Sequence, residues 1–205
     1  YANIDGFTYS EADLPIEKRP EIDRWILSEL NTLIKNVDTY YNDYEPTKAG
    51  RAIQDFVDAY LSNWYVRLCR RRFWKGEYTE DKISAYQTLY TCLETLSRLM
   101  SPIAPFFGER LFTDLNTVSG KIKVESVHHA AFPVADETII DKALEERMQL
   151  AQQISSMVLS LRKKTNIRVR QPLAKIMIPE SNERIKEQIN AVSNLICSEV
   201  NVKEI

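Results

Sequence analysis

Apolar residues recur at steps of three and four along most of this 205-residue chain, and this spacing constrains its fold more than any other feature. Such a period places the apolar side chains on one face of an α-helix. It predicts helices over residues 20–44, 46–76 and 79–100, and a long helix that begins near Asp136. Helices with one apolar face bury it against each other, so the pattern predicts a mainly α fold built as an antiparallel helix bundle.

Proline and glycine mark where these helices begin and end. Pro46 can occupy the first turn of the second helix and Gly76 can end it, while Thr79 is the expected N-cap of the third. A shorter helix is expected to follow Pro105 and to reach about Asn116. Residues 118–135 look irregular, with a short strand expected near Lys121–Val127.

The sequence changes character at both ends of the bundle. Residues 1–18 show no sustained period and are expected to form an extended lead-in, and residues 19–165 the helical bundle. A β-branched run, an amphipathic stretch and a second short apolar run come next, at residues 175–178, 182–198 and 200–205. Residues 166–205 are therefore expected to form a small C-terminal α/β appendage, truncated at its end, in a piece of a longer protein.

The segment Asn63–Trp74 combines four arginines with four aromatic residues and contains no acid. Arginine offers a planar, permanently charged group that matches phosphate oxygens, and aromatic rings offer surfaces on which bases stack. On a helical wheel of about 100° per residue, Arg71 and Lys75 continue the buried stripe while Phe73 points almost opposite. The helix end is therefore expected to protrude from the core, or its cations to pair with acids such as Glu77.

Basic residues are segregated, although the formal net charge is only −2. Two windows without any acid, residues 59–76 and 147–179, hold twelve of the 27 Lys and Arg residues, so 15 basic residues face 29 acidic ones in the rest of the chain. Such a distribution repels a polyanion from most of the surface and admits it at chosen places. The alternative is that these cations pair with acids elsewhere in the fold.

Other classes of function lack the residues they need. The five glycines are isolated, so no phosphate-cradling loop can form, and the adjacent His128 and His129 have no metal-ligand spacing. We expect no catalytic residues, no metal and a structural role for the two histidines. The three cysteines suggest reduced thiols and a cytoplasmic location, and no apolar run suggests a membrane span or a signal peptide.

Four motifs resemble those of the anticodon-binding helical bundle of class I aminoacyl-tRNA synthetases. Asn63–Trp74 and Leu99–Leu111 are similar to the enzymes for Ile, Val, Leu and Met, and Ser126–Pro133 and Val169–Leu173 resemble isoleucyl-tRNA synthetase. The Arg-Arg-Arg-Phe-Trp ending favours the isoleucine family over its relatives. The resemblance covers nearly the whole chain, with the motifs in order.

The resemblance implies a tRNA-binding fragment of an isoleucine–tRNA ligase, which positions tRNA(Ile) for aminoacylation. It implies no cofactor in the fragment, ATP and Mg in the parent enzyme, and catalytic and editing domains elsewhere in the same polypeptide. The alternatives are the same domain of a valyl, leucyl or methionyl enzyme, or a protein-interaction bundle without RNA binding. The candidate tRNA-binding residues are Arg67, Arg70, Arg71, Arg72, Trp74, Lys75, Lys163, Lys164, Arg168 and Arg170.

Overall fold

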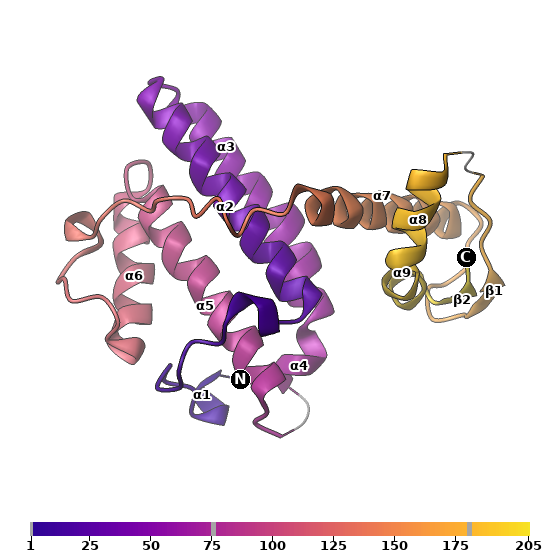
Figure 1. The fold of residues 1–205 in the computed structure, drawn as a ribbon, viewed down its shortest axis with the longest axis horizontal. Coiled ribbons are helices and arrows are strands. Elements are labelled where there is room, and N and C mark those ends of the chain that lie inside the picture. Colours follow the sequence, from indigo (N-terminus) through magenta and orange to yellow (C-terminus); the bar gives the residue numbers. More distant parts are fainter. Residues whose placement is uncertain (1, 75–76, 180–181) are drawn as a thin grey trace. The chain divides into compact units, whose positions relative to one another are not determined.

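The computed structural model describes residues 2–74, 77–179 and 182–205, and it divides the chain into two compact units, Tyr1–Ile140 and Asp141–Ile205 (Figure 1). The first unit contains α1 (Ala2–Asp5), α2 (Glu21–Asn42), α3 (Pro46–Asp55), a π-helix η2 (Phe56–Val66), α4 (Arg70–Trp74), α5 (Glu80–Met100) and α6 (Pro105–Ser119). The second contains α7 (Lys142–Lys164), β1 (Leu173–Lys175), α8 (Glu183–Ala191), α9 (Ser193–Val200) and β2 (Val202–Glu204). Each unit is described by itself below.

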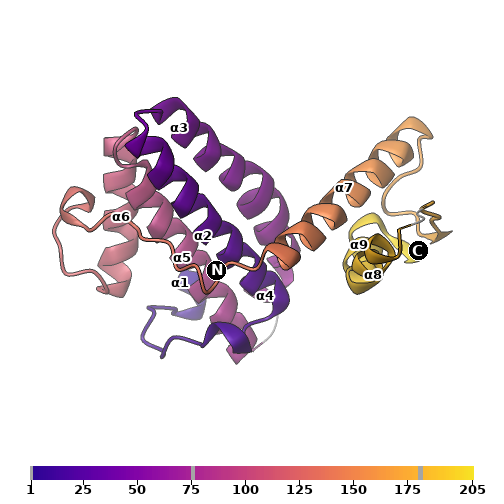
Figure 2. The ribbon, with the colours of Figure 1, turned by 45° about the horizontal axis from the view of Figure 1, so that its top comes forward.

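The prediction of a mainly α chain with a helical bundle is confirmed. In the first unit α2 forms a hairpin with α3 and η2, and it also packs on α5, which in turn packs on α6 (Figure 2). Trp25, Ile26 and Leu30 of α2 and Leu96 and Leu99 of α5 lie in this core, each at most 2% exposed. In the part of the chain that the structure describes, no helix combines the length and the apolar character needed to cross a membrane.

The second long helix differs from the prediction because its middle is π-helical. The apolar period predicts a buried stripe of Ile53, Phe56, Tyr60, Trp64 and Leu68. Ile53, Phe56 and Trp64 are buried as predicted, but the wider i→i+5 turns move the rest of the buried face by one residue. Tyr60 and Leu68, which were expected inside, are partly exposed. The buried side chains downstream are Leu61, Tyr65, Cys69 and Phe73. The prediction that Phe73 points away from the core is therefore wrong.

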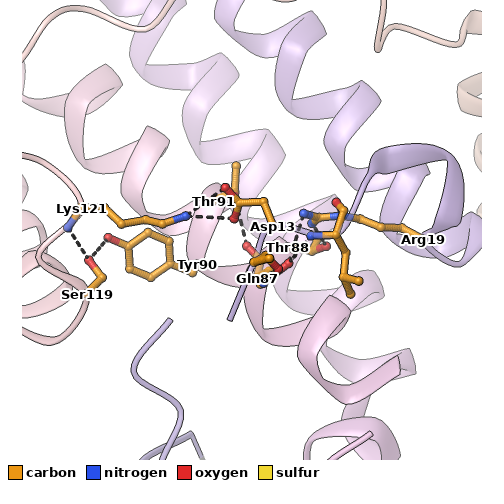
Figure 3. Close-up of polar contacts among 10 residues, drawn as sticks. Asp13, Arg19, Gln87, Thr88, Tyr90, Thr91, Ser119 and Lys121 are labelled. Atoms are coloured by element: carbon orange, nitrogen blue, oxygen red, sulfur yellow. Dashed lines mark hydrogen bonds and ion pairs between the residues drawn. The ribbon is translucent and has the colours of Figure 1, made fainter. Parts of the chain in front are cut away.

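The lead-in is not simply extended; much of it is fixed to α5. It contains α1 and a 3₁₀ turn (Ile16–Lys18), and Phe7 and Tyr9 are both buried, at 8% exposure. Figure 3 shows the polar contacts of its second half, where Leu14 N–H donates to Gln87 Oε1 at 3.0 Å and Lys121 Nζ lies 2.9 Å from Asp13. Residues 1–18 show no helical period, because most of them lie outside helices and are held by individual side-chain contacts with distant residues.

Several element boundaries differ from the predictions. The strand expected at Lys121–Val127 is absent; that segment is irregular up to a 3₁₀ turn at Val127–His129, held by Glu109, whose carboxylate accepts from the Val127 N–H at 2.8 Å. The long helix begins at Lys142, capped by Asp141, whose side chain accepts from the Leu144 N–H. Thr79 occupies the N-cap position of α5 but makes no side-chain capping bond.

The second unit has the expected small α/β character. β1 and β2 pair in parallel, with Leu173 opposite Val202 and Lys175 opposite Glu204, and the predicted single helix over 182–198 is divided into α8 and α9. The whole of α7 belongs to this unit, packing on α8 and α9, whereas the sequence placed a boundary after residue 165. Helical period alone does not reveal which neighbour an amphipathic helix packs on.

Candidate nucleic-acid interface

Three cations of α4 and of the turn before it share one side of the helix with an aromatic residue. Arg67, Arg70, Arg71 and Trp74 are spaced i, i+3, i+4 and i+7, which brings side chains to a common face. All four are exposed, Trp74 to 46%, while Phe73 on the other side is buried. We call these four residues the cationic face.

No acid of the described residues competes for Arg70 and Arg71. Both side chains are exposed, and neither makes an ion pair or side-chain hydrogen bond within residues 2–74, 77–179 and 182–205. An unpaired guanidinium at the surface keeps its five N–H donors directed at solvent, so it can give a bidentate contact to a phosphate without first breaking an ion pair.

Arg67 is held more firmly than its two neighbours on this face. Its Nε–H donates to the Asn63 carbonyl at 2.8 Å, and its guanidinium carbon lies 5.7 Å from the centre of the Trp64 ring. These contacts restrain the side chain along its own helix.

Arg72 is a structural residue, contrary to the prediction that it contacts tRNA. Its NH1 and NH2 groups donate to the two carboxylate oxygens of Asp23 at 2.7 and 2.9 Å. Its Nε and NH2 donate to the side chain and carbonyl of Asp81, at 3.0 and 2.9 Å, and NH1 also contacts Cys69 Sγ at 3.3 Å. These contacts use all five N–H donors, so no donor remains for a phosphate.

The Asp23–Arg72 pair lies at the centre of a buried network. Asp23 is fully buried and also accepts from the Tyr65 hydroxyl at 2.8 Å and from Ser84 Oγ at 2.6 Å. Burial alone would lower the pKa of Arg72, but its hydrogen bond to Asp23 and the charge of that carboxylate raise it well above its usual value. The network ties α2, η2, α4 and α5 together beneath the cationic face.

A pocket of about 560 Å³ opens beside the cationic face. Its lining includes the side chains of Val66, Phe73, Tyr86 and Leu89, with Arg67 and Arg70 at the same pocket. An apolar hollow with cations beside it suits a planar, partly apolar group attached to an anion, which is the chemistry of a nucleotide. The helical period predicts Tyr86 and Leu89 only as core positions of their helix, so the sequence alone does not reveal this pocket.

The second predicted cluster lies in the other unit. Lys163, Lys164, Arg168 and Arg170 are all exposed, at the end of α7 and in the loop that follows it. Arg162, only 3% exposed, organises that loop from inside. Its guanidinium donates to the carbonyls of Arg168, Gln171 and Asn201, at 3.1, 3.0 and 2.9 Å.

Two other sequence predictions concern Lys75 and the absence of a metal. Lys75 lies outside the described residues, so its predicted role stays a prediction. Across the described ranges, no group of three or more His, Cys, Asp and Glu side chains has an arrangement that could hold a metal ion. His128 and His129 are exposed, and their turn is fixed by Ser126, whose hydroxyl donates to Glu109 at 2.9 Å.

Comparisons with known proteins agree on one family. The profile of the family described as "Anticodon-binding domain of tRNA ligase" matches residues 23–178. The chain is 65% identical over 205 residues to an isoleucine–tRNA ligase of Bacteroides thetaiotaomicron and 61% identical to that of Cytophaga hutchinsonii, covering all of this chain and 18% of each relative. An isoleucine–tRNA ligase of Dehalococcoides mccartyi is 50% identical over 203 residues, 99% of this chain and 20% of the relative. The chain therefore belongs to the anticodon-binding domain family of tRNA ligases.

Proposed function

We propose that this chain binds the isoleucine-accepting tRNA and positions it for aminoacylation by an isoleucine–tRNA ligase. The observation that carries the proposal is the cationic face, where Arg70 and Arg71 are exposed beside an apolar pocket and have no acidic partner in the part of the chain that the structure describes. The choice of tRNA rests on the isoleucine–tRNA ligases that match the chain over its full length. ATP, Mg, and the catalytic and editing domains belong in this proposal to the rest of the same polypeptide, in the cytoplasm.

The proposed interface combines contacts to phosphates with contacts to bases, as nucleic-acid interfaces usually do. Bound phosphates fix the register and orientation of the RNA, and base contacts discriminate between sequences. Arg70 and Arg71 are assigned to backbone phosphates, with Arg67 beside them. Trp74 offers a half-exposed ring on which a base can stack, a contact that contributes about 1–3 kcal/mol per base.

The second cluster extends the proposed interface within the same RNA. Lys163, Lys164, Arg168 and Arg170 are assigned to phosphates at another part of the tRNA, as a separate contact line. The buried Arg162 keeps the loop of this cluster in one shape before binding. Preorganisation of this kind reduces the ordering entropy that binding would otherwise cost.

The salt dependence of tRNA binding tests the first contact line. Each lost phosphate contact reduces the slope of log K against log salt by about 0.7–0.9, so R70Q/R71Q should make the slope shallower by about 1.4–1.8. R51Q/R110Q is the matched control, because it also removes two exposed arginines of the first unit, neither of them on the cationic face. Equal slopes for R70Q/R71Q and this control would refute the assignment.

A protein-interaction bundle without RNA binding is the second candidate. The enclosure of Arg72 by Asp23 and Asp81 favours it, because it shows that one cation of the Arg-rich segment stabilises the fold. That candidate predicts that tRNA binding by the wild-type chain is no stronger than its binding of other polyanions of equal charge. Competition by heparin and by unrelated tRNA in the same titration separates the two functions.

A further inference from the structure

Tyr86 of α5 lies between the lead-in and α4. Its side chain is 5% exposed, and its ring centre lies 5.1 Å from that of Phe7 and 5.5 Å from that of Phe73. Its hydroxyl lies 2.6 Å from Asp5 Oδ2 and 3.1 Å from the Phe73 carbonyl oxygen. One side chain therefore contacts the lead-in and the last turn of α4 through both its ring and its hydroxyl.

The lead-in is fixed to the same part of α5 by a second contact. Lys82 is only 5% exposed and its Nζ lies 2.7 Å from Asp5 Oδ2, the oxygen that also accepts from Tyr86. Phe7, itself buried, adds the aromatic contact. Burial weakens solvent screening of this ion pair, so the docking of residues 5–7 depends on these α5 side chains.

The short helix α4 needs such support. It has five residues and follows η2 after a turn at Cys69, so its own helical hydrogen bonds are few. Besides its continuity with η2, its orientation depends on tertiary contacts, which are the Arg72 network on one side and the burial of Phe73 on Tyr86 on the other. Those two contacts therefore also position the exposed side chains of Arg70, Arg71 and Trp74.

We propose that Tyr86 is a positioning residue that couples the docking of the lead-in to the placement of the cationic face. The coupling rests on the proposed RNA-binding role of that face. When Phe7 and Asp5 hold Tyr86 from one side, its ring and hydroxyl fix Phe73 from the other. When the lead-in is released, Tyr86 gains freedom, and α4 samples orientations in which the arginines do not meet the RNA together.

Tyr90 provides a matched comparison one helical turn further along α5. Its ring centre lies 4.8 Å from that of Tyr9, and its hydroxyl contacts Ser119. Tyr90 therefore also holds the lead-in, but these partners are not on α4. Y86F removes hydroxyl contacts with the lead-in and with α4, whereas Y90F removes a hydroxyl contact with Ser119 of α6.

Hydrogen exchange at the α4 amides tests the coupling without any RNA. F7L and Y86F should accelerate exchange of the Arg70–Trp74 amides, because local opening becomes easier when fewer contacts hold the helix. Y90F, which removes a hydroxyl contact with Ser119 of α6, should leave those amides unchanged. F7L alters only the lead-in and so keeps the test valid even if a change at Tyr86 prevents folding. Equal exchange of the α4 amides in F7L and Y90F would overturn the proposal.

Titration with tRNA connects the coupling to function. If F7L lowers the fraction of molecules with a correctly placed face to one third, the apparent Kd rises about threefold. The same F7L change in the R70Q/R71Q background should have a smaller effect, because two of the α4 side chains through which it acts are already gone. An equal loss in both backgrounds would overturn the coupling. If R70Q/R71Q itself binds tRNA like the wild type, the proposed function fails, while hydrogen exchange still decides whether Tyr86 positions α4.

Discussion

Replacement of Arg72 by glutamine separates the structural cation from its exposed neighbours. In the folded protein Arg72 gives Asp23 two hydrogen bonds, at 2.7 and 2.9 Å, and the Asp23 carboxylate has no exposed surface. R72Q removes the only cation that this carboxylate contacts among the described residues. Tyr65 and Ser84 continue to donate to Asp23, so the carboxylate keeps two of its hydrogen bonds but loses its counter-charge.

The expected loss of stability follows from this burial. Removing one partner of a buried ion pair destabilises a protein by about 3–5 kcal/mol. The lower end applies here, because two neutral donors remain and the Arg72 side chain is itself 16% exposed. For a folding unit of this size, each kcal/mol changes Tm by about 3–4 °C, so R72Q should melt about 10 °C below the wild type.

Thermal unfolding followed by circular dichroism measures the effect, with R70Q and R71Q as controls. The three variants carry the same chemical change on one short helix, but Arg70 and Arg71 are exposed and unpaired within the described ranges, so their stability should change by less than about 0.5 kcal/mol. Neutralising the stranded acid in D23N/R72Q should recover part of the loss. If R72Q melts together with R70Q and R71Q, the network does not support the fold and the structural role of Arg72 is refuted.

Three further outcomes are expected. R162Q should accelerate hydrogen exchange in the loop after α7 while leaving the first unit unchanged, because the buried guanidinium holds three carbonyls of the second unit. The hydrogen bond from Lys82 lowers the pKa of Asp5 in the folded protein. The ionised Asp5 therefore stabilises the folded state above the ordinary carboxyl pKa, and this stabilisation is lost as the pH falls through the lowered pKa. Proteolysis of the lead-in should accelerate over that acidic range. Burial raises the pKa of the Cys92 thiol and closes it to solvent, so a thiol reagent should label Cys197 first in the native protein and Cys92 only on unfolding.

The bundle was predictable from the sequence because apolar residues recur at steps of three and four along α2 and α5. Residues 20–44 and 79–100 were close to the observed α2 and α5, since proline or an acidic first turn marks the start of each. The α/β character of the C-terminal unit was also predictable from its short β-branched runs. The docking of residues 5–14 was not, because its contacts on α5 lie more than 70 residues away in the chain.

Local sequence cannot show that Arg72 is turned inward and paired while Arg70 and Arg71 are exposed. Its main partner, Asp23, is 49 residues earlier and looks in the sequence like an acid that favours the first turn of a helix. Only the fold shows that this carboxylate faces inward. Charge counts over residues 59–76 therefore overstated the number of cations available to RNA.

Three consecutive arginines cannot all face the same RNA from a helix, because successive side chains are separated by about 100°. One of them must turn towards the bundle, where an unpaired charge is costly. The π-helical turns of η2 decide which one, since they shift the buried face so that Phe73 enters the core. Arg72 then meets Asp23 and Asp81, and Arg70 and Arg71 are directed outward. The inward arginine fixes the helix that displays the outward pair, so the three positions serve the proposed interface by two different physical means.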